Sequence, residues 1–444
     1  MRRPTSWLFA SLAVALAAAT TALAQAPAPP AQPPAPAAPA APAVKPFKLG
    51  VVSFLSGPAA GPFGVPGRNA AEVTIEALNA GKVPAPYTQK GLGGRPIEVV
   101  YVDEAGGPTT QVTEFRNLVQ RQNVDAVIGY ISSGDCLAIA PVAEELKKLT
   151  LFYDCGTPRI FEDASYKYVF RTAPHATMDN VAAALYVTEV KPKLKKVAGI
   201  NQNYAWGQDS WVDFEATMKQ LKPDVQITTS QMPKLYAGQY GAEISALMSG
   251  SPEVIHSSFW DGDLDAFVLQ ASPRGLFKKS TVLLTAGETA MYKLAGQLPD
   301  GTIIGARGPN GVFAPEGELN KWFRATYHDR FTLWPVYPSY RMAQAILGLK
   351  SAYEKAQAGG AAAPDQDQII AALERLTFES PSGTVKMAIG KGHQAVMETV
   401  YGTAKTVGGK LTFANVKRYP AEKVNPPEGV KSADWIKATF KPIK

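Results

Sequence analysis

Short apolar runs alternate with segments of helical periodicity from residue 47 onward, and this alternation limits the possible folds more than any other feature of the chain. Short apolar runs are typical of strands, and apolar residues three and four positions apart indicate helices. A repeated strand–helix order favours a parallel sheet covered by helices on both faces. The first strands are expected at 47–54, 96–103, 126–130 and 151–153, and the first helices at 69–78, 108–123 and 137–148.

The same alternation starts again after residue 172 and predicts a second α/β unit of similar length. A chain of 444 residues is also too long for one small domain. We therefore expect an α/β fold with two doubly wound lobes, each built around a parallel sheet. The further strands are expected at 196–200, 225–228, 254–258 and 281–284, the further helices at 178–188, 207–221, 240–249, 264–272, 316–331, 340–356 and 365–376, and a terminal hairpin at 397–403 and 410–415.

The N-terminal segment 1–24 has the features of an export signal. Arg2 and Arg3 supply the positive end, and the apolar stretch that follows is shorter than the ~20 residues that span a membrane. We therefore favour a signal peptide cleaved near Ala24 over a membrane anchor, and expect a soluble protein in the periplasm. Segment 25–45 is rich in Ala and Pro and has little to bury, which predicts a semi-rigid linker outside the fold.

Charge and motif content exclude several classes of function. The 45 Lys and Arg exceed the 38 Asp and Glu by seven without forming a basic block, which argues against a nucleic acid partner. The sequence has no P-loop, HExxH or GxSxG motif. We expect no enzyme, no cofactor and no metal site. The four histidines are dispersed, and each is interpreted as a surface or hinge residue: His175, His256, His328 and His393.

The two cysteines, Cys136 and Cys155, are interpreted as a disulfide, because a pair in an exported protein is more often bonded than free. The alternative, a redox or metal pair, lacks CxxC spacing and a nearby histidine. If the bond forms, it ties together two turns that each follow a predicted strand. These turns are 132–135 and 154–158.

The turns that follow the predicted strands are candidates for a binding site, because ligands of open parallel sheets bind at the carboxyl ends of strands. Ser132-Ser133-Gly134-Asp135 enters a helix and suits a carboxylate, although Ser and Asp also serve as ordinary helix caps. Both interpretations stand. In the second unit the corresponding turns combine aromatic and acidic residues, as expected around a small organic ligand: 203–207, 259–261 and 285–288.

Several of these segments together resemble the leucine/isoleucine/valine-type solute-binding proteins of ABC importers, which bind branched-chain amino acids. No single motif is specific, and the resemblance depends on their order and spacing over residues 47–413. The similar segments are 48–51, 57–58 with Gly64, 128–134, 155–157, 170–174, 203–207 and 382–385.

This resemblance implies a type I periplasmic binding fold, in which two lobes are joined by three crossings and close on a ligand. Lobe 1 would comprise 46–172 and 307–385, and lobe 2 would comprise 173–306 and 386–420. The remaining residues, 421–444, would form a C-terminal extension.

The resemblance also implies which residues bind the ligand. Its carboxylate would be held by Ser133 and Thr157, with the backbones of Gly134 and Cys155 beside them. Aromatic contacts and an acid that pairs with the ligand's ammonium group would complete the site. These further positions are Phe63, Trp206, Trp260 and Glu288.

The sequence departs from the family at three of the positions around this site. Phe63 and Trp206 stand where tyrosines are common, and Asp154 adds a charge beside the threonine turn. These departures favour another amino-acid-like or carboxylate-bearing solute over a branched-chain amino acid as such, and a carboxylate-bearing aromatic compound and an amide are the alternatives.

The expected function is that of a monomeric periplasmic binding protein that delivers its solute to an inner-membrane permease. The alternatives are a ligand-sensing partner of a membrane receptor and a secreted hydrolase that uses Asp261 and Glu288.

Overall fold

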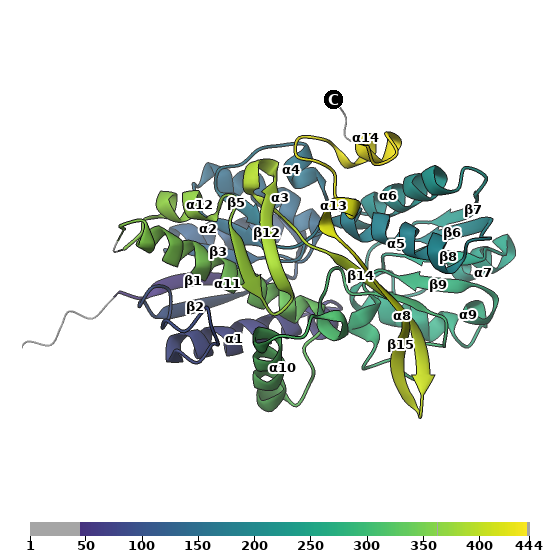
Figure 1. Cartoon of the computed structure of the whole chain (residues 1–444), viewed down its shortest axis with the longest axis horizontal. Helices are drawn as coiled ribbons and strands as arrows, with labels where there is room; N and C mark the ends of the chain where they lie inside the picture. Colours follow the sequence, from purple (N-terminus) through teal and green to yellow (C-terminus); the bar gives the residue numbers. More distant parts are fainter. Residues whose placement is uncertain (1–44, 362, 442–444) are drawn as a thin grey trace, which may run out of the picture. The chain divides into compact units, whose positions relative to one another are not determined.

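The computed structural model describes residues 45–361 and 363–441. The predicted signal peptide, 1–24, and nearly all of the predicted linker, 25–45, lie outside the described residues. Within the described residues, no helix is both long and apolar enough to cross a membrane. Two sheets, each flanked by helices, organise this part of the chain (Figure 1).

The first sheet has eight strands in the order β11-β12-β13-β5-β4-β3-β1-β2, and its five-stranded core β5-β4-β3-β1-β2 is parallel. The core strands alternate their side chains between two apolar layers, as strand geometry requires. The strands are β1 (Phe47–Ser53), β2 (Ile97–Asp103), β3 (Ala126–Gly129), β4 (Thr150–Phe152), β5 (Val169–Arg171), β11 (Thr377–Ser380), β12 (Gly383–Ile389) and β13 (Gln394–Val396).

Helices cover both faces of this sheet. Val51, Ile128 and Leu151 face one apolar cluster, which contains the buried sides of α1 and α11. Val52 and Val127 face the other cluster, which contains the buried sides of α2 and α3. The helical elements of this lobe are η1 (Ala60–Gly64), α1 (Val65–Ala80), α2 (Gly107–Gln120), α3 (Ser133–Glu145), α4 (Arg159–Glu162), η3 (Gly311–Phe313), α10 (Glu318–Phe331), α11 (Tyr337–Ala358), α12 (Gln366–Leu373) and η4 (Gly390–Gly392).

The second sheet has seven strands in the order β15-β14-β10-β9-β8-β6-β7, with the parallel core β10-β9-β8-β6-β7. Its helices also lie on both faces (Figure 1). The strands are β6 (Lys196–Ile200), β7 (Gln226–Gln231), β8 (Val254–Ser257), β9 (Thr281–Leu284), β10 (Ile303–Gly305), β14 (Thr399–Val407) and β15 (Lys410–Tyr419), and the helices are α5 (Ala176–Val190), α6 (Ala205–Leu221), α7 (Gly241–Gly250), α8 (Asp261–Ala271), α9 (Leu276–Lys279) and η2 (Gly287–Ala290).

The expected fold class, two doubly wound α/β lobes joined by three crossings, is confirmed. The chain passes from the first sheet to the second after β5, returns after β10, and passes to the second sheet again between β13 and β14. The last passage lies between Val396 and Thr399, whereas the predicted lobe boundaries place it after residue 385. The terminal hairpin β14–β15 is antiparallel, as expected.

The main difference from the predicted elements lies in β11, β12 and β13, which the sequence analysis did not identify as strands. They form antiparallel pairs at one edge of the first sheet. The exposed sides of β11 and β12 carry polar residues such as Glu379 and Lys386. Such edge strands lack the continuous apolar run that marks a strand buried on both faces. The strand β10 is only three residues long and was also not predicted.

The C-terminal segment contacts both lobes. Its two short helices, α13 (Ala421–Val424) and α14 (Ser432–Lys437), pack against α5 and α6 of the second lobe. Ser432 also donates two hydrogen bonds to the first lobe, because its backbone N–H and its hydroxyl both donate to Glu162 Oε1.

Candidate ligand-binding cleft

Ser133 joins the two turns that the sequence analysis placed side by side. Ser132 caps α3 by accepting the N–H of Asp135, which places Ser133 in the first turn of the helix. The hydroxyl oxygen of Ser133 accepts the N–H groups of Gly156 and Thr157, at 3.1 and 3.2 Å. Because a hydroxyl can accept two hydrogen bonds and still donate one, the proton of Ser133 remains available to a ligand.

The predicted disulfide between Cys136 and Cys155 is confirmed, and it links the same two turns. The N–H of Cys155 donates to the carbonyl of Tyr130, and the carbonyl of Cys155 accepts from Arg171 Nη1. The Cys155 backbone is therefore committed to contacts within the protein.

A small cavity between the lobes, here called the tryptophan cavity, contains Ser133, Trp206 and Trp260 in its walls. Its volume is about 10 Å³, which is close to the space that one water molecule needs. The side chains around it are held tightly: Trp206 Nε1 donates to the carbonyl of Ser258 at 2.8 Å. A ligand larger than water would therefore require the lobes to separate. The remaining wall residues are Ile131, Gly156, Tyr204, Arg307 and Tyr337.

Arg307 is the main candidate site residue that sequence reasoning missed. It lies in the second crossing, shortly after β10, and only 4% of its surface is exposed. Its guanidinium lies 4.1 Å from the centre of the Trp206 ring. Nη1 donates to Asp154 Oδ1 at 2.8 Å and Nε donates to Asp179 Oδ2 at 3.1 Å. The position after a strand was the available signal, but β10 was too short to recognise.

The unused nitrogen of Arg307 lies at the tryptophan cavity. Nη2 has no hydrogen-bond partner among the described residues, and the phenol ring of Tyr337 is close beside the guanidinium. Burial lowers the pKa of Arg307, but the neighbouring Asp154, Tyr337 and Asp179 outweigh burial and raise the pKa above its ordinary value. The group therefore carries a positive charge and can donate a hydrogen bond to an anionic oxygen.

A second, larger cavity adjoins the first through Tyr204, which lines both; we call it the tyrosine cavity. Its volume is about 420 Å³, within the range of sites for small organic ligands. Gly134 lies in its wall, with Asp135 beside it. Burial raises the pKa of Asp135 to about 7. The other wall residues are mainly apolar or aromatic: Phe54, Pro58, Pro108, Leu235 and Tyr236.

The structure places the remaining predicted site residues outside both cavities. Phe63 is buried against Trp260 and Tyr337, with ring centres 5.2 and 5.4 Å apart. Thr157 uses its hydroxyl to bind Asp209 Oδ2 of the second lobe. Glu288 is buried, and its Oε2 accepts the N–H of Tyr337 at 2.8 Å.

Glu288 therefore contacts Tyr337, which lines the tryptophan cavity, but does not line that cavity itself. Burial raises its pKa to about 7. A carboxyl group in this position supports the backbone of Tyr337, and the proposed role in binding a ligand's ammonium group stays a prediction.

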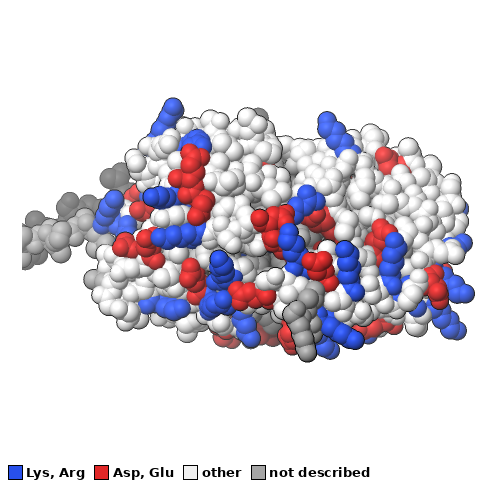
Figure 2. Space-filling model, turned by 90° about the horizontal axis from the view of Figure 1, so that it is seen from above, with Lys and Arg blue, Asp and Glu red and all other residues white. Residues whose placement is uncertain are grey.

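Acidic residues, histidines and cysteines are not gathered into a metal site in the described part of the chain. No group of three or more His, Cys, Asp or Glu there could hold a metal ion. On the face shown in Figure 2, basic and acidic side chains are interspersed without a continuous field of one sign.

Comparisons with known proteins agree with this architecture. A family model described as periplasmic binding protein matches residues 46–409. No curated protein sequence matches the chain. Among solved structures, a solute-binding protein of an ABC transporter from R. palustris, in complex with benzoate, is similar with a TM-score of 0.73 and 19% identity, covering 87% of this chain and 99% of that chain.

Two further solved structures show the same likeness. A solute-binding protein of an ABC transporter from Rhodopseudomonas palustris BisB5, in complex with 3,4-dihydroxybenzoic acid, has a TM-score of 0.72 and 22% identity, covering 84% of this chain and 97% of that chain. A leucine-binding protein from Thermotoga maritima has a TM-score of 0.69 and 19% identity, covering 83% of this chain and 98% of that chain. At these identities the likeness establishes the fold.

Proposed function

This chain belongs to the periplasmic binding protein family, and from that premise we propose that it is the exported solute-binding protein of an ABC importer, which captures a small carboxylate-bearing solute between its lobes. Members of this family bind solutes, so the chain is not an enzyme. In the proposed cycle the solute enters the open cleft, the lobes close, and an inner-membrane permease receives it.

The observation that carries this proposal is the buried Nη2 of Arg307 in the wall of the tryptophan cavity. An unpaired, buried guanidinium N–H costs roughly 1–3 kcal/mol. A carboxylate would remove this cost, and the Ser133 hydroxyl, which lines the same cavity, would supply a second donor.

The aromatic walls support an organic body attached to that carboxylate. Trp206 and Trp260 line the tryptophan cavity, and Tyr204 connects it with the tyrosine cavity. Flat rings of this kind provide a large apolar contact area. The benzoate and dihydroxybenzoate carried by two of the similar structures are of this chemical class, and leucine, for which the third protein is named, is an aliphatic carboxylate.

The test is a screen of purified, ligand-stripped protein against amino acids and aromatic acids, followed by calorimetry on the best ligand. Arg307→Lys keeps a positive charge beside Asp154 and Asp179 but removes Nη2. A hydrogen bond to a charged group is worth roughly 1.5–3 kcal/mol, so affinity should fall about 10- to 100-fold.

The control is Arg116→Lys, an arginine of α2 that pairs with Glu145 and lines neither cavity. Its affinity should equal that of the wild type. Unchanged affinity in Arg307→Lys would remove the main support for the proposed carboxylate site.

A further inference from the structure

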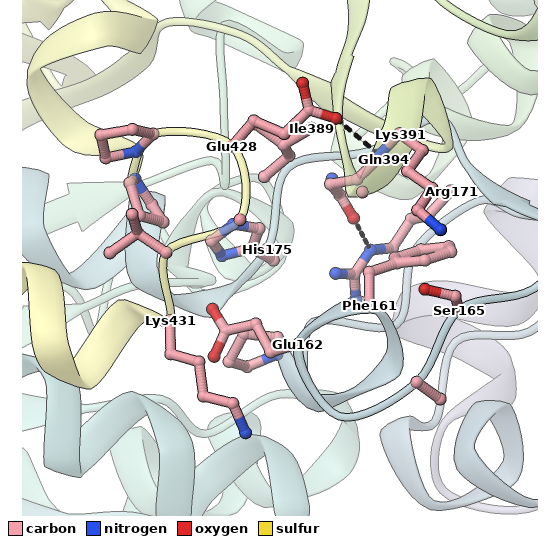
Figure 3. Close-up of a pocket in the computed structure, with 17 residues that line it drawn as sticks. Phe161, Glu162, Ser165, Arg171, His175, Ile389, Lys391, Gln394, Glu428 and Lys431 are labelled. Atoms are coloured by element: carbon pink, nitrogen blue, oxygen red, sulfur yellow. Dashed lines mark hydrogen bonds between the residues drawn. The ribbon is translucent and has the colours of Figure 1, made fainter. Parts of the chain in front are cut away.

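A cavity of about 230 Å³ lies where the first and third crossings meet the C-terminal segment. We call it the hinge cavity (Figure 3). Its walls come from α4 and the loop after it, the end of β5, the segment from η4 to β13, and residues 426–431. It shares no wall residue with the tryptophan cavity or the tyrosine cavity.

Arg171, at the end of β5, supplies an unpaired donor beside this cavity. The side chain is fully buried. Nε donates to Gln394 Oε1, and Nη1 donates to the carbonyls of Cys155 and Thr157 at 3.0 and 2.6 Å. Nη2 has no hydrogen-bond partner among the described residues. Figure 3 shows the guanidinium at the edge of the cavity, next to Gln394 and Phe161.

Arg171 lies among both cations and acids. Arg171, Arg307 and Arg341 lie close enough to repel one another, and the acids around them are Asp154, Asp179 and Glu162. Burial, and then repulsion from the two other arginines, lowers the pKa of Arg171 to about 9. The charges of this group are therefore matched in number, and what a ligand would supply is a hydrogen-bond acceptor for the unpaired N–H group of Arg171.

The acidic residues in the cavity wall already have partners. Glu162 Oε1 accepts the N–H and hydroxyl of Ser432. The carboxylate of Glu428 accepts from Arg375 Nη2 at 3.0 Å and from the backbone N–H of Lys391 at 2.8 Å.

The wall of the hinge cavity also contains basic side chains and a neutral histidine. Lys431 pairs with Asp163. The ammonium of Lys391 has no ion-pair partner in the described ranges, so it and Arg171 Nη2 are the cationic donors available to an anion, and the hydroxyl of Ser165 also lies in the wall. His175 stays neutral, because burial holds its pKa well below the ordinary range.

Apolar groups form much of the remaining wall. The ring of Phe161 lies 5.7 Å from the guanidinium carbon of Arg171. Pro426, Pro427 and Val430 face the cavity from the C-terminal segment. The cavity is smaller than the roughly 300–1,000 Å³ of sites for drug-sized ligands, so it suits a compact molecule.

We propose that the hinge cavity is a second binding site, for a small monocarboxylate with an apolar body. The carboxylate accepts a hydrogen bond from Arg171 Nη2 and lies near the ammonium of Lys391. The apolar body lies against Phe161 and the two prolines. The site is separate from the cleft, although the same guanidinium also fixes the carbonyls of the turn that contains Gly156 in the cleft wall.

The test uses crystals of the protein soaked in 4-bromobenzoate, because the anomalous signal of bromine locates each bound molecule. We expect a bromine peak in the hinge cavity, with the carboxylate on Arg171 Nη2. The absence of a hinge peak at saturating concentration overturns the proposal. A peak confined to the cleft overturns the second site and leaves the proposed carboxylate site of the cleft intact.

A pair of valine substitutions tests the site in solution. Val430→Trp should fill the hinge cavity without touching Arg171, whereas Val416→Trp places the same side chain on the exposed surface of β15, where Val416 is 46% exposed. In calorimetry, Val430→Trp should bind one equivalent of 4-bromobenzoate fewer than Val416→Trp. Equal stoichiometry of these two variants contradicts the proposal.

Discussion

The hydroxyl of Thr157 donates a hydrogen bond of 2.6 Å to Asp209 Oδ2, and this bond joins the two lobes. Thr157 follows β4 in the first lobe, and Asp209 lies on α6 of the second. Arg159 Nε also donates to Asp209, at 2.9 Å. One carboxylate of the second lobe therefore holds two residues of the first lobe in the closed arrangement.

Thr157→Val should favour the open arrangement, because valine has a similar shape but no hydroxyl. A hydrogen bond to a charged group contributes roughly 1.5–3 kcal/mol. We expect ligand affinity to fall by about tenfold or more in calorimetry, and the ligand-free protein to show a larger radius of gyration in small-angle scattering. Thr113→Val, an exposed change within α2, is the control. An unchanged radius and affinity would show that this bond does not control closure.

Gly156→Ala should block closure by a steric route. A Cβ atom at this position would lie 2.3 Å from Trp206 Cε3 and 2.6 Å from Arg307 Nη2. Neither group can move freely, since Trp206 Nε1 is bonded to Ser258 and Arg307 is bonded to two aspartates. We expect ligand affinity to fall by about 5- to 150-fold, since overpacking typically costs 1–3 kcal/mol.

The matched control for this prediction is Gly296→Ala, where the added Cβ atom has no neighbour within 4 Å. Its affinity should equal that of the wild type. Wild-type affinity in Gly156→Ala as well would mean that the lobes do not bring Gly156 against Trp206 when ligand binds.

The central strands and helices could be predicted from sequence because their signals are local. Strand β9, Thr281–Leu284, is a continuous apolar run and was placed at its observed bounds. The edge strand β11 alternates buried and exposed residues over four positions, and a pattern this short does not distinguish a strand from a loop. The structure of such edges depends on pairing with distant segments.

Only part of the candidate site could be predicted from the sequence, because side-chain directions also depend on distant segments. Trp206 and Trp260 follow strands, and both line the tryptophan cavity. Position after a strand shows where a residue lies but not where its side chain points. Thr157 turns toward Asp209, and Glu288 turns toward the backbone of Tyr337. These directions are set by partners that are 52 and 49 residues away in sequence.

Removal of the disulfide should lower stability and leave the ligand contacts in place. Cys136 and Cys155 are 19 residues apart, and a loop of this size corresponds to about 3 kcal/mol in the loop-entropy model. The Cys136→Ala/Cys155→Ala double variant should unfold at lower denaturant concentration by an equivalent amount. A reducing agent should destabilise the wild type but have no effect on the double variant. Equal stability of the two proteins without reductant would contradict a stabilising role.

The last prediction concerns a chain of hydrogen bonds that includes the buried carboxyl of Asp213. The Thr177 hydroxyl lies 2.7 Å from Asp213 Oδ2 and 2.6 Å from the Ser432 hydroxyl, which donates to Glu162. A hydroxyl carries one proton, so Thr177 can donate to Ser432 only if Asp213 donates to Thr177. A protonated Asp213 satisfies the whole chain, and burial raises the pKa of Asp213 to about 8.

This protonation makes stability dependent on pH. Between the ordinary aspartate pKa of 3.8 and the folded value of about 8, the folded protein keeps a proton that the unfolded chain has released. The contribution of Asp213 to the free energy of unfolding is therefore complete below the lower pKa and is lost as the pH rises through the higher one.

Asp213→Asn keeps an N–H donor toward Thr177 but does not titrate. The control is Asp224→Asn, an exposed change that leaves Asp213 in place. In urea unfolding across this range, the free energy of unfolding of the control should fall with rising pH by up to about 1.4 kcal/mol per pH unit, and that of Asp213→Asn should lack this fall. Identical slopes in the two variants would mean that Asp213 is ionised in the folded protein, and the chain from Asp213 to Glu162 would then have to be broken at one of its hydroxyls.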